Sequence, residues 1–321
     1  MAASNDISIT SVPSDVGSVF PGKSRAPDAL QAAGLVEKLR ALGFNVNVYN
    51  ALPDGPVGWA ESNSEPSGAR NEAAAVTVCQ AVKSTIATAL AATALCDLLP
   101  FQLILGGECL VCPAIMSALT HHLPGSRVGL LYVDADCDLT YPHEPGSSGN
   151  IASMTFTHLT LRPEALQSMR QFSRPGGAGV VDSSNAVLFG LNSSSPANKR
   201  DHLGYLFNNN YRVITSDAVV VDAGARATEA LRWLEERVDY ILVHLDVDVI
   251  DPGLFPLGNI PNYTGIRFPD IMTALRIFLA SSKAVGLTIA EVNPDHDPGL
   301  LMTRRLVDEV VLGLKDRLQE V

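Results

Sequence analysis

The chain has 321 residues, 46% of them hydrophobic and 18% charged, so it can bury a large core within one α/β domain. Its formal net charge of −11 argues against nucleic acid and against anionic membrane surfaces as partners. The odd count of five cysteines and the lack of a basic, apolar N-terminal leader predict a reducing, cytoplasmic location and no secretory signal.

Short apolar runs alternate with amphipathic segments of helix length along the chain, which predicts a mostly parallel sheet with helices on both faces. A Gly-, Pro- and Ser-rich stretch over 51–70 predicts a loop. No repeat or linker interrupts the pattern, so we expect a single three-layer domain over residues 1–321. The expected strands begin near Asp6, Phe44, Phe101, Arg127, Asn185, Tyr211, Asp239 and Ala284, and the expected helices include 26–43, 71–97 and 300–318.

The most apolar segment covers residues 85–105. It contains Asp97 and Pro100, which neither a membrane-spanning helix nor a continuous core helix accommodates easily. We therefore expect a buried helix followed by a strand, and no membrane span.

Two of the expected strands become acidic where they end. "LYVDADCDLTYP" carries Asp134, Asp136 and Asp138, and "HLDVDVIDP" carries Asp246 and Asp248. Alternate residues of an extended strand share a face, so each set can point to one place if the chain stays extended. In parallel sheets, ligands bind beyond the carboxyl ends of the strands, and neighbouring strands would bring all five carboxylates together there.

Five clustered carboxylates repel one another, and neither motif contains a lysine or arginine that would neutralise them. Two divalent cations would resolve this conflict, because oxygen ligands suit Mg²⁺, Mn²⁺ and Ca²⁺. A pair of ions can also activate water as a nucleophile. Either motif taken alone is equally compatible with a solvated acidic loop, and it is the two together that favour a metal site.

These motifs, in this order along nearly the whole chain, resemble those of the arginase superfamily, the ureohydrolases. The resemblance implies a single α/β domain with an eight-stranded parallel sheet, two manganese ions, a trimer or hexamer, and hydrolysis of C–N bonds in linear amidine or guanidino compounds. The implied chemistry is attack of an activated water on the amidine carbon, followed by loss of an amine. The segments that carry the resemblance are "GKSRAPDALQAAGLVEKL" (22–39), "GGECL" (106–110), "DADCD" (134–138), "HLDVDVIDP" (244–252) and "EVNP" (291–294).

The resemblance also implies roles for individual residues. Asp134 and Asp246 would bridge both metals, Asp138 would complete the first metal site, and Asp248 would complete the second. Glu291 falls on the acidic residue that lies near the guanidinium group in the family. Asp138 and Glu291 are accordingly the candidate catalytic residues. His143, in the loop after "DADCD", is a candidate proton shuttle, with a solvated loop histidine as the alternative.

Cys109 and Asp136 stand where the family has its two metal-binding histidines. Both side chains can ligate metal, but thiolate favours Zn or Fe and carboxylate favours Mn or Mg. We therefore expect two divalent ions, with Mn first and Mg, Zn or Fe as alternatives. His244 lies two residues before Asp246 and could replace a lost nitrogen ligand, directly or as the partner of a ligand.

The segments expected to bind substrate also depart from the family. In "SSGNIASM", Ser148 and Asn150 are candidate substrate contacts, but Ala152 replaces a family histidine. In "GLNSSSP", Ser193 and Ser195 replace acids that help to hold the α-amino group in arginases. The expected substrate is therefore a small guanidino or amidine compound other than arginine. The alternatives are an arginase-like binding or regulatory protein without catalysis, or another metal-dependent reaction on this fold.

Overall fold

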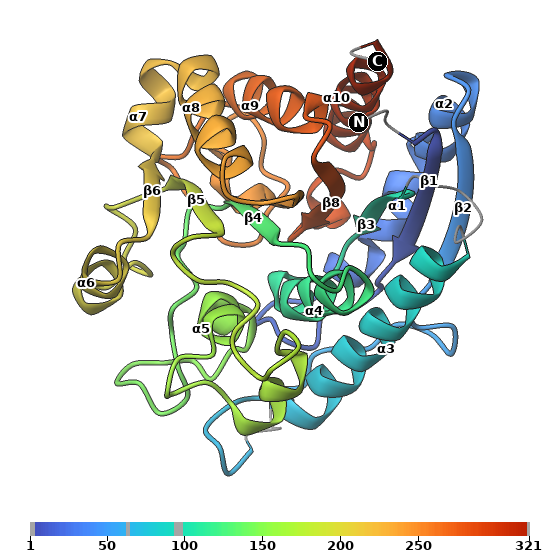
Figure 1. The fold of residues 1–321 in the computed structure, drawn as a ribbon. Coiled ribbons are helices and arrows are strands. Elements are labelled where there is room, and N and C mark those ends of the chain that lie inside the picture. The colour runs from blue at the N-terminus through green and yellow to red at the C-terminus, as the bar shows by residue number, and fades with distance from the viewer. Residues whose placement is uncertain (1–3, 62–64, 93–98, 320–321) are drawn as a thin grey trace.

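The computed structural model describes residues 4–61, 65–92 and 99–319. Its centre is an eight-stranded, wholly parallel sheet with the strand order β2-β1-β3-β8-β7-β4-β5-β6 (Figure 1). The predicted α/β architecture is confirmed. The strands are β1 (Asp6–Ser11), β2 (Asn45–Asn50), β3 (Phe101–Leu105), β4 (Val128–Val133), β5 (Ala186–Leu191), β6 (Arg212–Thr215), β7 (Tyr240–Asp246) and β8 (Ala284–Ala290).

The helices form a layer on each face of the sheet, as Figure 1 shows. The α-helices are α1 (Ala26–Ala32), α2 (Leu35–Ala41), α3 (Glu72–Ala91), α4 (Cys112–His122), α5 (Thr155–Thr160), α6 (Arg200–Asn208), α7 (Ser216–Val221), α8 (Ala223–Glu235), α9 (Phe268–Ala280) and α10 (Leu301–Gln319). One hydrophobic cluster joins one face of the sheet to α1, α2, α8, α9 and α10, and a second joins the other face to α3, α4 and α5. Strands β3, β4, β5 and β8 are buried along their whole length, which is why they occur in the sequence as largely apolar runs.

Two predicted helices differ from the observed ones. The segment 26–43 forms two helices, because Gly34 adopts a left-handed conformation (φ 89°) between α1 and α2. The helix expected over 71–97 is α3 over Glu72–Ala91, and its expected C-terminal part falls in 93–98, outside the described residues.

Helix α3 is long and apolar enough, by length and composition alone, to cross a membrane. In the fold it packs against α4, and its Val78, Val82 and Ile86 side chains are fully buried. One face of α3 is thus buried against the core, and residues 93–98 of the apolar segment lie outside the described residues.

The strand order places the unusual sequence motifs side by side. The neighbouring strands β3, β8, β7 and β4 run in the same direction, so their carboxyl ends meet at one edge of the sheet. These four ends lead into "GGECL", "EVNP", "DVDVIDP" and "DADCD". Four motifs that are far apart in the sequence therefore surround one place, at the edge of the sheet where ligands bind in folds of this class.

Candidate metal centre

A cavity of about 210 Å³ lies at this edge of the sheet. All six residues predicted as metal ligands line it, together with the candidate catalytic residue Glu291. The six are Cys109, Asp134, Asp136, Asp138, Asp246 and Asp248.

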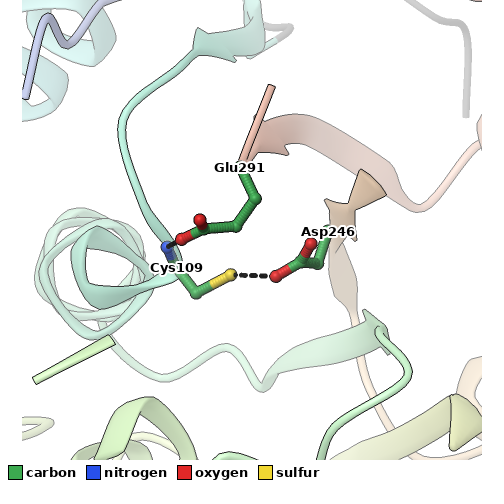
Figure 2. A group of neighbouring side chains, drawn as sticks. All are labelled: Cys109, Asp246 and Glu291. Atoms are coloured by element: carbon green, nitrogen blue, oxygen red, sulfur yellow. Dashed lines mark hydrogen bonds between the residues drawn. The ribbon is translucent and has the colours of Figure 1, made fainter. Parts of the chain in front are cut away.

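Cys109 lies at the centre of the site. The chain leaves β3 through Gly106 and Gly107, both with positive φ, and Cys109 then begins a short 3-10 helix. Its thiol donates to Oδ2 of Asp246 at 2.7 Å, while its backbone N–H donates to Glu291 (Figure 2). Burial, and then the charge of Asp246, raises the pKa of the thiol well above its ordinary value. In the metal-free protein this sulfur therefore keeps its proton, and a bound cation would favour its release.

Two groups of side chains have the spacing needed to hold a metal ion. Cys109, Asp246 and Glu291 form one, and their side chains approach one another from three different segments (Figure 2). Cys109, Asp134 and Asp138 form the other. In each group the candidate ligand atoms lie within 4.8 Å of one another, and the two groups share the sulfur. The cysteine that replaces a family histidine therefore occupies a position from which it can bind metal.

The three aspartates of "DADCD" were expected to point together if the chain stays extended; the strand ends before them, yet all three line the cavity. Strand β4 ends at Val133, and Oδ1 of Asp134 accepts from the backbone N–H of Asp136 at 2.7 Å. This turn directs Asp136 toward Ser195, whose hydroxyl donates to it at 2.8 Å. Asp138 adopts a positive φ of 47° and returns to the site, where the Tyr132 hydroxyl donates to its Oδ2 at 2.6 Å.

The second acidic motif makes the same turn. Oδ1 of Asp246 accepts from the backbone N–H of Asp248 at 2.7 Å, and a 3-10 turn over Val247–Val249 follows. Asp248 lines the cavity but, among the described residues, it belongs to neither potential ligand group. In both D-x-D motifs, the first carboxylate fixes the backbone two residues later, which breaks the strand's alternation.

Buried oxygen atoms at the site lack partners. Oδ2 of Asp134 and Oδ1 of Asp248 are buried and have no hydrogen bond within the described structure. Burial, followed by the charge of Asp138, raises the pKa of Asp134 well above its ordinary value, and burial followed by Asp134 does the same for Asp246. Buried carboxylates in this state require protons or cations. Their oxygen atoms, together with the Cys109 sulfur, fit divalent metal ions.

His244 is fully buried beneath the site. Its Nε2 lies 3.1 Å from Sγ of Cys109, and its ring stacks on Tyr132 with the centroids 4.8 Å apart. Burial lowers the pKa of His244 to about 3, so the imidazole is neutral. His244 thus contacts the candidate ligand Cys109, which corresponds to the expected arrangement in which it is the partner of a ligand.

The candidate substrate and proton-transfer residues divide into two sets. Ser148 and Asn150 line the main cavity, and Ser195 lines an adjoining one of about 140 Å³. Ser193 is exposed and lines neither cavity in the described structure. His143 is also exposed, and its ring lies beside Gly68 rather than at the main cavity as the structure describes it.

Sequence reasoning missed two charged residues at the site. Lys23 is fully buried, and its Nζ lies 3.4 Å from Oε2 of Glu291. Glu108 is also buried, and it accepts hydrogen bonds from the Ser14 hydroxyl at 2.8 Å and the Gly17 backbone at 2.5 Å. Burial, and then the charge of Glu291, raises the pKa of Glu108 to about 8. Glu108 belongs to the "GGECL" segment and could have been noticed there, but no spacing in the sequence connects Lys23 with Glu291.

Comparison with known proteins shows the family and the fold of this chain. The model of the arginase family matches residues 5–314. An arginase of Staphylococcus aureus (strain MRSA252) is 26% identical over 302 residues, which cover 92% of this chain and 93% of the relative. The native structure of Bacillus caldovelox arginase superimposes with a TM-score of 0.80 at 21% identity, covering 100% and 99% of the two chains. Trypanosoma cruzi formiminoglutamase with Mn²⁺ gives a TM-score of 0.66 at 17% identity, covering 98% and 94%.

Proposed function

The chain belongs to the arginase family, and on this basis we propose that it hydrolyses the C–N bond of a linear amidine or guanidino compound other than arginine. The observation that carries the proposal is the pair of potential metal-ligand groups that share Cys109 and extend to Glu291 and to Asp138. This arrangement gives one cavity both a place for metal and carboxylates close enough to act on a bound substrate.

The proposed metal ligands form two sets. Cys109 and Asp138 would hold one ion, Asp136 and Asp248 would hold the other, and Asp134 and Asp246 would contribute to either. We propose divalent ions, with Mn²⁺ as the first candidate because the T. cruzi relative is described with Mn²⁺. The sulfur keeps Zn²⁺ and Fe²⁺ as alternatives, and the carboxylates keep Mg²⁺. When bound, such ions supply an activated water for attack on the amidine carbon.

The protein's own side chains would orient the substrate and move protons. Glu291 offers a carboxylate at the cavity for the amidine nitrogens. The Tyr132 hydroxyl donates to Oδ2 of Asp138. We therefore propose that Oδ1 of Asp138 takes a proton from water and gives it to the leaving amine. The exposed position of His143 gives it no part in this transfer.

The residues facing the substrate support the exclusion of arginine. Ser148 and Asn150 line the cavity with hydroxyl and amide groups, and Ser195 is bonded to Asp136. Because Ser193 and Ser195 replace the acids that pair with an α-amino group in arginases, a free amino acid would lose an ion pair here. We propose a small substrate that lacks a free α-amino group.

The test is turnover of the manganese-loaded protein on arginine, hydroxyarginine, agmatine, guanidino acids and formimino compounds, with release of urea or amine as the readout. We expect activity on at least one compound other than arginine. Asp246→Asn should abolish both metal binding and turnover. Asp251→Asn is a matched change in the same motif whose amide oxygen can still accept from the Gly253 backbone, and it should keep both. A protein that holds metal yet releases nothing across this panel would refute the proposal.

A second function, binding or regulation without catalysis, is favoured by a specific observation. Asp136 is bonded to Ser195, and Glu291 already has Lys23 beside it, so two residues expected to act on metal and substrate have other partners. Metal content separates the two functions, because we expect the regulatory form to bind less than one ion per chain after loading. A cytoplasmic homo-oligomer, a trimer or hexamer, stays a prediction in either case.

A further inference from the structure

The main cavity offers no charged side chain to the tail of a substrate, which is the part of the molecule beyond its guanidino or amidine group. All six carboxylates of the lining already have a proposed role, five with metal and that of Glu291 with the amidine nitrogens. Among the described residues that line the cavity, none is a lysine, arginine or histidine. We propose that the tail of the substrate is an uncharged, apolar group such as a short alkyl chain. The inference rests on the proposed function, because it names the substrate class of the same cavity.

Two apolar side chains stand at the open side of the cavity. Val19 comes from the loop after β1, and Ile260, which is 43% exposed, comes from the segment between β7 and α9. The two segments adjoin, because the Asn259 side chain donates to the Phe20 carbonyl at 3.4 Å. The backbone N–H of Ile260 is hydrogen-bonded to the Asp248 carboxylate, so this residue lies directly beside a proposed metal ligand. An alkyl tail can bury these side chains, whereas a charged tail would lose hydration against them.

Small apolar residues complete this lining. Ala152 and Ala197 both line the cavity, and a methyl group is all that either side chain offers to a ligand. The volume of about 210 Å³ lies below the ~300–1,000 Å³ of pockets that hold drug-sized ligands, so the tail has room for only a few carbon atoms. The lining therefore fits a short hydrocarbon chain.

The neutral polar side chains of the cavity are largely engaged with the backbone. The Asn150 amide nitrogen donates to the carbonyl oxygens of Ser18 at 2.8 Å and of Gly17 at 2.9 Å. The Ser153 hydroxyl donates to the Asn150 carbonyl at 2.8 Å. Among the neutral side chains of the described lining, this leaves the hydroxyls of Ser148 and Ser18 as donors. Two donors are too few for a buried carboxylate, whose two oxygens together accept about four hydrogen bonds.

The test compares three guanidino compounds that share the head group and a four-carbon tail and differ in charge. The tail of n-butylguanidine is neutral, that of agmatine is cationic and that of 4-guanidinobutanoate is anionic. For the manganese-loaded protein we measure kcat/KM for urea release and, separately, Kd by calorimetry. We expect n-butylguanidine to exceed both charged compounds at least about tenfold in each measurement, because a charged tail loses hydration here without gaining an ion pair.

Two matched variants locate the tail. Ile260→Arg places a positive charge beside it and should shift the ratio of the Kd values by about tenfold in favour of 4-guanidinobutanoate. Leu254→Arg adds the same charge in the same segment, at a side chain that is 80% exposed and lies outside the cavity lining as described, so it should leave the ranking unchanged. The metal content of both variants is measured first, so that a lost ion is not mistaken for a changed preference.

The outcomes separate this inference from the proposed function. Faster urea release from a charged compound than from n-butylguanidine would overturn the inference and leave the proposed hydrolysis standing. If none of the three compounds releases urea, selective binding of n-butylguanidine would support the apolar tail and count against hydrolysis, whereas equal or absent binding would overturn the tail as well. An unchanged ranking in a folded Ile260→Arg variant would contradict the place of the tail beside Ile260. Should that variant fail to fold, the wild-type ranking still decides the charge of the tail.

Discussion

Raising the pH should destabilise the metal-free protein, because its folded state keeps carboxyl protons that the unfolded chain has lost. Burial, and then neighbouring carboxylates, raises the pKa of Asp134 and Asp246 well above their ordinary value and that of Glu108 to about 8. In the unfolded chain these groups ionise near pH ~4. For a pKa raised by folding, the stabilisation is fully present below the unfolded pKa and is lost as the pH rises through the folded one.

The expected loss follows from the number of retained protons. Between about pH 7.5 and about pH 8.5, each carboxyl that stays protonated in the folded state lowers the free energy of unfolding by ~1.4 kcal/mol. Glu108, half titrated at about pH 8, contributes about half of that amount. Burial lowers the pKa of His158 and His244 to about 3. These two histidines therefore change the free energy of unfolding mainly below pH ~6.5, outside this interval.

Urea unfolding followed by circular dichroism measures this effect, with the protein in chelator and, separately, loaded with Mn²⁺. We expect the pH dependence in chelator to be smaller in Asp246→Asn than in the wild type, because the variant lacks one ionisable carboxyl. In the wild type it should also shrink when Mn²⁺ replaces the protons. An unfolding free energy that stays constant or rises over this interval in chelator would show that the carboxyls are already ionised, and the electrostatic reasoning would be refuted.

Three further predictions concern single side chains. Cys109→Ser replaces sulfur by oxygen and should weaken Zn²⁺ binding more than Mn²⁺ binding in metal titrations; equal losses would argue against a sulfur ligand. Burial lowers the pKa of His158 to about 3, so the folded wild type loses up to ~1.4 kcal/mol of stability per pH unit at this residue as the pH falls from about 6 to about 4. His158→Phe should abolish this loss. An unchanged pH dependence of urea unfolding in the variant would contradict the reasoning. Gly258→Ala places a methyl group on the Asp248 carboxylate and should weaken Mn²⁺ binding at the second position without unfolding the protein, so unaltered titrations would count against a role for Asp248 there.

The sequence predicted the strands well because a wholly parallel sheet buries both faces of its central strands. β4 and β7 therefore occur as apolar runs, and the change to aspartate marks where each strand ends. The break in the first predicted helix was missed, because Gly34 within an otherwise helical pattern does not reveal its left-handed conformation.

The candidate metal ligands predicted from the sequence line one cavity, but the orientation of their side chains was not predictable. Alternation along a strand suggested that the aspartates of each D-x-D motif point together, but Asp134 and Asp246 each bond the backbone two residues later and turn the chain. The proximity of Lys23 to Glu291 depends on how the loop after β1 folds over the end of β8, and a contact between residues so far apart leaves no local pattern in the sequence.

Anomalous X-ray diffraction from crystals soaked in Mn²⁺ tests the metal centre most directly. The account predicts an anomalous peak in the cavity, within bonding distance of Cys109, Asp134, Asp138 and Asp246, with a second peak beside Asp248. A fully soaked crystal with no anomalous peak in this cavity would contradict it.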